Sequence, residues 1–173
     1  SWGDAFGDAG YIYISYEDKS ISGAVFTEFE SADNYRHNYQ YDGSSGSSSV
    51  RVATRASHAN VFQVKGNPSG SEILKAVGIL ISSANTDLAV DVYTELTDPA
   101  DPSSGIHMIS AQPVSARYSG YYTFPLQNEV ALRENSYFSV IFTNRSDTEK
   151  NFSIESTVDS GWIAFEASVG AGQ

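Results

Sequence analysis

Residues 73–96 read ILKAVGILISSANTDLAVDVYTEL, and no other part of the chain shows its secondary structure as plainly. The first half is a long apolar run. The second half alternates apolar and polar residues, which is the period-two pattern of a strand with one buried face. Asn85 and Asp87 lie between the halves and favour a tight turn. The stretch therefore predicts two long strands that pair as an antiparallel hairpin.

Similar short runs lie on both sides of this stretch, at intervals of about 8–12 residues. They cover residues 11–16, 23–29, 50–55, 59–65, 107–116, 120–126, 136–143, 151–156 and 161–167. Residues 129–135 predict a brief strand followed by a turn, and the two Asp-Pro steps within 97–105 predict a loop. No segment has a sustained helical period. The sequence therefore predicts an all-β chain that folds as an antiparallel two-sheet β-sandwich of the jelly-roll kind.

Length and charge restrict the class of protein. The chain has 173 residues, which fits one domain, or one domain with a fragment of another. Its 21 acidic and 10 basic residues give a net charge of −11, which argues against nucleic acid or an anionic membrane surface as the partner. No run approaches the roughly 18 apolar residues of a membrane helix, so no membrane span is expected.

The chain carries no motif of a self-contained enzyme. It has no cysteine, which excludes a disulfide, a zinc-thiolate site and a thiol nucleophile. His37, His58 and His107 are the candidate bases, and none lies in a catalytic motif. The chain contains no G-x-S-x-G, H-E-x-x-H or phosphate-binding loop. We therefore expect no catalytic residue and no enzyme activity from this chain alone.

Cofactor binding is not expected, with calcium as the alternative. Asp98 and Asp101 lie in the Asp-Pro loop, and Asp33 and Asp42 flank a tyrosine-rich stretch. Calcium prefers such oxygen ligands. However, the chain has no EF-hand pattern, and aspartates beside prolines usually form turns. The sequence therefore leaves the metal ligands unassigned.

The tyrosine-rich stretch is the candidate ligand-binding site. Residues 34–42 read NYRHNYQYD. Sugar recognition uses an aromatic ring for the apolar C–H face, and amides or carboxylates for the hydroxyl groups. The candidate binding residues are Tyr35, Asn38, Tyr39, Tyr41 and Asp42. Alternatively, the tyrosines pack one face of a strand, as half-buried strands require. Both interpretations remain open at this point.

The start of the chain resembles a segment of papain-like cysteine peptidases. Residues 1–15, SWGDAFGDAGYIYIS, resemble the stretch that follows the catalytic asparagine of that family. Residues 1–3 match its Ser-Trp-Gly, residues 6–7 match its Trp-Gly with Phe6 in place of Trp, and residues 10–12 begin its closing strand. The resemblance implies that Trp2 is a remnant shield of a histidine–asparagine pair. The catalytic cysteine, histidine and asparagine would then precede Ser1.

The remainder is similar to the lectin-like domain found downstream of papain-like peptidases in secreted bacterial proteins. This similarity implies a remnant of the peptidase domain at residues 1–21 and a lectin-like β-sandwich at 22–173. It also implies a non-catalytic accessory module, secreted or at the cell surface of a bacterium, that binds a glycan, another cell-surface ligand or the upstream catalytic domain.

Two further expectations follow from the resemblance to a peptidase. Instead of binding a glycan, the chain could be the C-terminal part of a peptidase that is active only with its missing half, the sandwich being a positioning domain. A strand at residues 11–16 that has lost its sheet seeks a new partner. We therefore expect it to be loosely ordered, to pack on the sandwich or to pair with a second copy in a homodimer.

Overall fold

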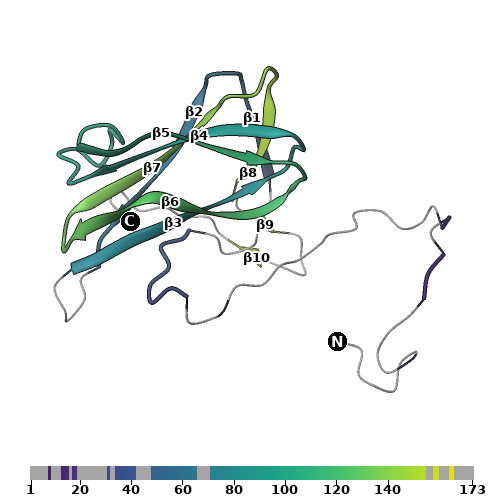
Figure 1. Cartoon of the computed structure of the whole chain (residues 1–173), viewed down its shortest axis with the longest axis horizontal. Coiled ribbons are helices and arrows are strands. Elements are labelled where there is room, and N and C mark those ends of the chain that lie inside the picture. Colours follow the sequence, from purple (N-terminus) through teal and green to yellow (C-terminus); the bar gives the residue numbers. More distant parts are fainter. Residues whose placement is uncertain are drawn as a thin grey trace. The chain divides into compact units, whose positions relative to one another are not determined.

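The computed structural model describes residues 8, 13–15, 17–18, 31, 34–41, 48–65, 71–154, 158–159 and 164–165 (Figure 1). The chain divides into two compact units, Ser1–Arg36 and His37–Gln173. In the first unit, the Tyr13 hydroxyl donates a 3.3 Å hydrogen bond to Asp8 Oδ2. The predicted strand over residues 11–16 is wrong at residues 13–15, which join no ladder; the rest of that range lies outside the described residues. A strand exists only where a neighbour satisfies its backbone groups.

The second unit is an antiparallel β-sandwich, which confirms the predicted fold class. One four-stranded sheet has the order β1-β8-β3-β6 and the other has the order β2-β7-β4-β5. A short ladder pairs β10 with β9. The described residues contain no helix. The strands are β1 (Ser48–Val52), β2 (Ser57–Gln63), β3 (Ser71–Ile81), β4 (Thr86–Thr94), β5 (Ile106–Ala116), β6 (Gly120–Arg133), β7 (Tyr137–Asn144), β8 (Lys150–Ile154), β9 (Val158–Asp159) and β10 (Ala164–Phe165).

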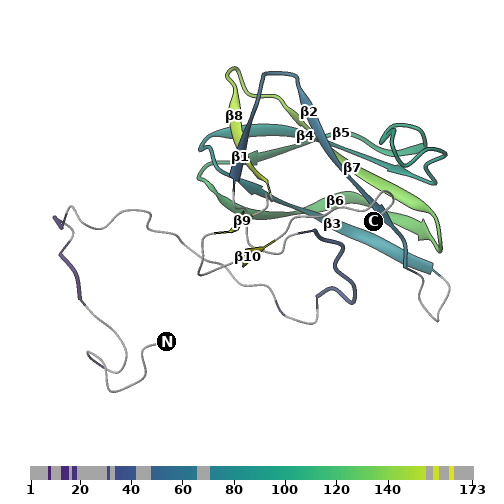
Figure 2. The ribbon, with the colours of Figure 1, turned by 180° about the vertical axis from the view of Figure 1, so that it is seen from behind.

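The predicted hairpin over residues 73–96 is wrong. Both strands form, and Asn85 adopts the left-handed backbone of a turn residue (φ 50°). However, β3 lies in the first sheet and pairs β6 and β8, whereas β4 lies in the second and pairs β5 and β7. Residues 82–85 therefore arch from one sheet to the other, as the views from the two sides show (Figures 1 and 2). Both strands have a strongly apolar face, and burying those faces against each other stabilises the sandwich more than placing them side by side.

The remaining described strands follow the predicted pattern with one extension, whereas the predicted strand over residues 23–29 lies outside the described residues. Residues 120–126 and the brief strand at 129–135 are parts of one strand, β6, which runs to Arg133. Its pairing with β3 shifts from Val130 opposite Leu74 to Pro125 opposite Ala76, so a bulge joins the two parts. Residues 97–105 form the predicted loop.

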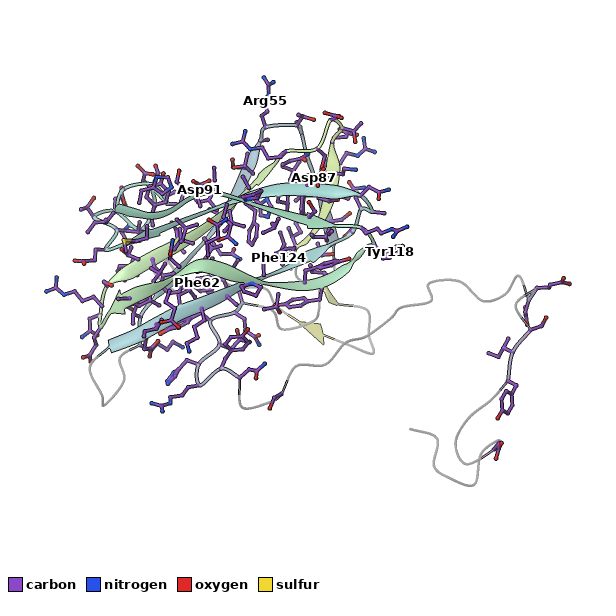
Figure 3. The ribbon with its side chains drawn as sticks, viewed as in Figure 1. Arg55, Phe62, Asp87, Asp91, Tyr118 and Phe124 are labelled. Carbon is purple, nitrogen blue, oxygen red and sulfur yellow. The ribbon has the colours of Figure 1, made fainter. Side chains whose placement is uncertain are left out.

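The hydrophobic core lies between the two sheets. Alternate residues of β3 and β4 provide its centre, and Phe138, Phe142 and Phe152 extend it. Figure 3 shows the side chains that fill this layer, with Phe62 and Phe124 labelled. The segment 37–41 lies against this core through its tyrosines, and this contact positions the candidate site.

Candidate functional site

Tyr39 and Tyr41, two of the predicted ligand-binding residues, pack against the sandwich. The Tyr39 ring meets Phe138 edge to face, with centroids 5.2 Å apart at 87°. The Tyr41 ring stacks on Phe62 at 4.8 Å and 12°. Both tyrosines are half-buried and adjoin the core. Both rings therefore pack on the core, but residues 37–41 are not a strand, so the interpretation that the tyrosines pack one face of a strand is wrong in that respect.

A buried carboxylate lies beneath this aromatic segment. The Glu72 side chain is only 8% exposed, and its Oε2 accepts a 2.6 Å hydrogen bond from the Tyr39 hydroxyl. His37 Nδ1 lies 3.7 Å from Oε1, which has no hydrogen-bond partner among the described residues. The Tyr39 oxygen in turn accepts a 3.3 Å hydrogen bond from the Lys65 N–H. Glu72 thus anchors the segment 37–41 to the first residues of β3.

The electrostatics of the two tyrosines fit the role of neutral donors. Burial, and then the hydrogen bond to Glu72, raise the pKa of Tyr39 to about 12. Burial also raises the pKa of Tyr41, whose hydroxyl donates a short hydrogen bond to the Val61 carbonyl. Each phenol therefore keeps its proton near neutral pH and fixes the segment to the sandwich.

The other predicted site residues form no hydrogen bond with the Tyr39–Glu72 pair in the described part of the structure. Asn38 is exposed, and its Nδ2 donates a 2.7 Å hydrogen bond to Gln40 Oε1. Tyr35 belongs to the first unit and is 42% exposed. Asp42 and Trp2 lie outside the described residues. Asn38, Tyr39 and Tyr41 are neighbours in the sequence, only the two tyrosines contact the core, and the role of all three in binding stays a prediction.

Sequence reasoning missed Glu72, although one signal was present. Glu72 precedes the apolar run of β3 and shares its inward face with Leu74, because alternate residues of a strand point the same way. A carboxylate at an inward position needs a partner. The sequence does not show that this partner is Tyr39, which lies 33 positions away.

The other two candidate bases occupy different environments. His107 Nε2 lies 2.8 Å from Asp91 Oδ1, and the His107 ring stacks on Tyr93 at 4.2 Å and 2°. His58 lies between the rings of Phe142 and Phe152, and burial lowers its pKa. His107 thus contacts an aspartate and a tyrosine ring, and His58 contacts two phenylalanine rings.

The carboxylates of the Asp-Pro loop, residues 97–105, accept hydrogen bonds from groups of the same loop. Asp98 Oδ1 accepts a 2.9 Å hydrogen bond from the Ala100 N–H, and Asp101 Oδ1 accepts hydrogen bonds from the N–H and hydroxyl of Ser103. These hydrogen bonds from Ser103 lower the pKa of Asp101. They are the turn contacts expected of aspartates in loops. Over the described ranges, no three His, Cys, Asp or Glu residues form a group that could hold a metal; Asp33 and Asp42 lie outside those ranges.

Comparison with known proteins identifies the family. Residues 38–173 match the lectin-like domain family, so the chain belongs to it, and the predicted lectin-like resemblance is confirmed. No curated protein matches the chain. The second compact unit begins at His37, close to the start of the family match. The predicted boundary between residues 21 and 22 lies outside the described residues and stays a prediction.

Two solved structures resemble the chain. One is the clostridial cysteine protease Cwp84 after propeptide cleavage, with 18% identity, a TM-score of 0.52 and coverage of 74% of this chain and 30% of that chain. The other contains the cysteine protease and lectin-like domains of Cwp84, a surface layer associated protein of Clostridium difficile, with 18% identity, a TM-score of 0.48 and coverage of 69% and 25%. The chain thus spans less than a third of their length, and the first likeness shows the shared fold. Within the part of the chain that the structure describes, no helix is long and apolar enough to cross a membrane.

Proposed function

We propose that the chain is a non-catalytic accessory module of a papain-like cysteine peptidase that works at a bacterial cell surface, and that the module binds a surface glycan. The observation that carries this proposal is the lectin-like match over residues 38–173 on the same chain as the peptidase-like motif at 1–15. The fold shared with a structure of a clostridial cysteine protease supports it. The chain contributes no thiol, so the nucleophile belongs to the missing part of the parent protein.

The test compares the parent protein with a variant that lacks residues 38–173. Both are assayed on a small soluble peptide and on a protein held on isolated cell envelopes, with a thiol-alkylating inhibitor as the control for cysteine-peptidase activity. We expect equal rates on the soluble peptide and a large loss of cleavage on the envelopes for the truncated form. Equal rates on both substrates would contradict an accessory role. A parent without thiol-dependent peptidase activity would contradict the link to a peptidase.

A second candidate function is that the sandwich positions the catalytic domain, completing the peptidase as its C-terminal part. The specific observation that favours it is the anchored entry into the sandwich. Tyr39, Tyr41 and Glu72 fix the segment 37–41, through which any upstream domain is joined to the fold. A rigid connection fixes the orientation of an upstream domain relative to the sandwich better than a flexible linker does. In the same assay, this function predicts a loss of rate on the soluble peptide as well as on the envelopes.

A further inference from the structure

One end of the sandwich carries positive charge, although the chain as a whole is acidic. The connections from β1 to β2, β3 to β4, β5 to β6 and β7 to β8 all lie at this end, as the ladders show. These connections and the first residue of β8 provide four cationic side chains, which we call the cationic rim: Arg55, Arg117, Arg145 and Lys150. Within the described ranges, none of the four forms a salt bridge.

Arg55 and Arg145 are neighbours across two of these connections. The Arg55 N–H donates a 2.8 Å hydrogen bond to the carbonyl of Asn144, the residue before Arg145. Both arginines are exposed, and Figure 3 shows Arg55 pointing away from the sandwich. The Arg145 N–H donates a 2.8 Å hydrogen bond to the Asp87 carbonyl, at the start of β4. The backbone of this pair is therefore fixed close to the arch at residues 82–85.

The other two members of the rim contact the arch directly. The Lys150 ammonium group donates a 3.1 Å hydrogen bond to the Ala84 carbonyl. The Asn85 N–H donates a hydrogen bond of the same length to the Arg117 carbonyl. Ala84 and Asn85 precede Asp87 by three and two residues, which span at most about 11 Å. The four cations therefore form one continuous row across this end of the sandwich.

An exposed tyrosine extends the row beside Arg117. The Arg117 guanidinium lies over the Tyr118 ring, with Cζ 5.4 Å from the ring centroid, and Tyr118 is still 61% exposed. The Tyr122 hydroxyl holds this turn, because it donates a 2.9 Å hydrogen bond to the Tyr118 carbonyl and accepts one of 3.3 Å from the Tyr118 N–H. Since the turn is fixed in advance, a ligand that contacts the ring loses little free energy in ordering it.

Few carboxylates offset the charge of the rim. Glu149 Oε1 already lies 3.3 Å from Arg51 Nη1, and Asp87 Oδ1 accepts a 2.6 Å hydrogen bond from the Ser115 hydroxyl. Asp147 is the remaining carboxylate of these four connections. The acidic connection from β4 to β5 lies at the other end of β4, a strand length of about 30 Å away, whereas salt screens charges beyond about 8 Å. The net charge of −11 therefore does not set the field at the rim.

A row of cations beside an aromatic ring matches the chemistry of an anionic polysaccharide. Carboxylate and phosphate groups pair with arginine and lysine, and the C–H face of a sugar packs on an aromatic ring. One exposed ion pair contributes little, so the row suits a polymer whose successive charges engage several cations together. We propose that the cationic rim binds a polysaccharide that carries carboxylate or phosphate groups, and that one of its sugar rings packs on Tyr118. This site rests on the glycan ligand of the proposed function and assigns it to the rim rather than to the tyrosines at 35–41.

The experiment uses the full 173-residue chain on an array of neutral, carboxylated and phosphorylated oligosaccharides, with duplex DNA and phosphatidylglycerol vesicles alongside. The oligosaccharide that binds best is then titrated by calorimetry at low and at high salt. We expect it to be anionic, and we expect binding to weaken about tenfold or more between roughly 50 and 300 mM salt, because each ion pair releases counterions.

Two double variants with the same change in net charge locate the site. Arg55→Gln combined with Arg145→Gln should weaken binding about tenfold or more, because it removes half of the rim. The matched control is Lys75→Gln combined with Arg133→Gln, which removes two exposed cations from salt bridges away from the rim and should leave binding nearly unchanged. Tyr118→Ala should weaken binding about threefold or more through the lost sugar contact.

The outcomes separate this site from the proposed function. Binding to neutral oligosaccharides alone, or equal affinities in the two double variants at the thermal unfolding midpoint of the wild type, would overturn the rim and leave glycan binding standing. Equal affinity for duplex DNA or for the vesicles would overturn a polysaccharide as the ligand of the rim. Binding to no oligosaccharide would overturn this site together with the glycan part of the proposed function, whereas the link to a peptidase would still be decided by the cleavage assay of the parent.

Discussion

The Tyr39 hydroxyl donates a 2.6 Å hydrogen bond to Glu72 Oε2 across 33 positions of the sequence. This contact ties the segment at the start of the second unit to the start of β3. A phenol paired with a buried carboxylate is a strong hydrogen bond, because the acceptor is charged. The pair therefore explains why a glutamate is tolerated at an inward position beside the core.

Replacing Tyr39 by Phe tests this anchor. The variant leaves the buried Glu72 carboxylate without its donor, and we expect a loss of about 1–3 kcal/mol in the free energy of unfolding, measured in urea. Tyr41→Phe is the matched comparison, because it removes a hydrogen bond to the neutral Val61 carbonyl, worth only about 0.5–1.5 kcal/mol. A larger loss in Tyr41→Phe than in Tyr39→Phe would contradict the role of Glu72.

The raised pKa of Tyr39 predicts a dependence of stability on alkaline pH. Its folded pKa of about 12 lies above its ordinary value of 10.0, so the folded state binds its proton more tightly. The contribution of the protonated Tyr39 phenol to the free energy of unfolding is therefore complete below pH 10. It is lost as the pH rises from about 10 through 12. Ultraviolet titration follows the ionisation of tyrosines. We expect the Tyr39→Phe variant to show one tyrosine fewer than the wild type among those that ionise at high pH. An identical titration at the alkaline end in both proteins would refute the assignment.

His58 predicts a loss of stability in the acidic range. Burial lowers its pKa below the ordinary 6.5, so the unfolded state takes up the proton first, and its contribution is complete above about pH 6.5 and falls as the pH decreases. His58→Phe keeps a ring between Phe142 and Phe152 but cannot be protonated. Between about pH 7.5 and 5, we expect the unfolding free energy of the wild type to decrease more than that of the variant, since carboxylates contribute equally to both. Parallel pH profiles would show that His58 does not carry this effect.

Replacing Asn144 by Asp should greatly reduce the stability of the fold. It is fully buried at the end of β7, where its Nδ2 donates 3.0 Å hydrogen bonds to the carbonyls of Val52 and Thr148, and its Oδ1 accepts one from the Ser146 N–H. Asn144→Asp keeps the shape but removes the donor, which leaves two carbonyls unpaired beside a buried carboxylate. We expect a loss of about 3 kcal/mol in urea unfolding. Asn60→Asp, at an exposed position of β2, is the control and should change stability by less than about 0.5 kcal/mol.

The strands were predictable from local pattern, but their partners were not. Residues 73–81 form an apolar run, residues 88–94 alternate apolar and polar residues, and Asn85 is a turn residue. Whether two such strands pair side by side or face each other depends on which other strands are available, and β6 and β7 are distant in the sequence. The sequence pattern alone therefore placed the strands correctly and the hairpin wrongly.

The candidate site was half predictable for the same reason. The alternation of Tyr39 and Tyr41 indicates packing in the sequence, but only the positions of Phe62 and Phe138 show that the two rings meet the sandwich without a strand between them. Such contacts between distant segments carry no signal in a single sequence.

The most direct test of the account is co-sedimentation of the 173-residue chain with isolated cell envelopes of the organism that produces it. The wild-type chain should sediment with the envelopes and be released by a soluble oligosaccharide prepared from them. A wild-type chain that remains in the supernatant at all envelope concentrations would contradict the claim that this module binds a surface glycan.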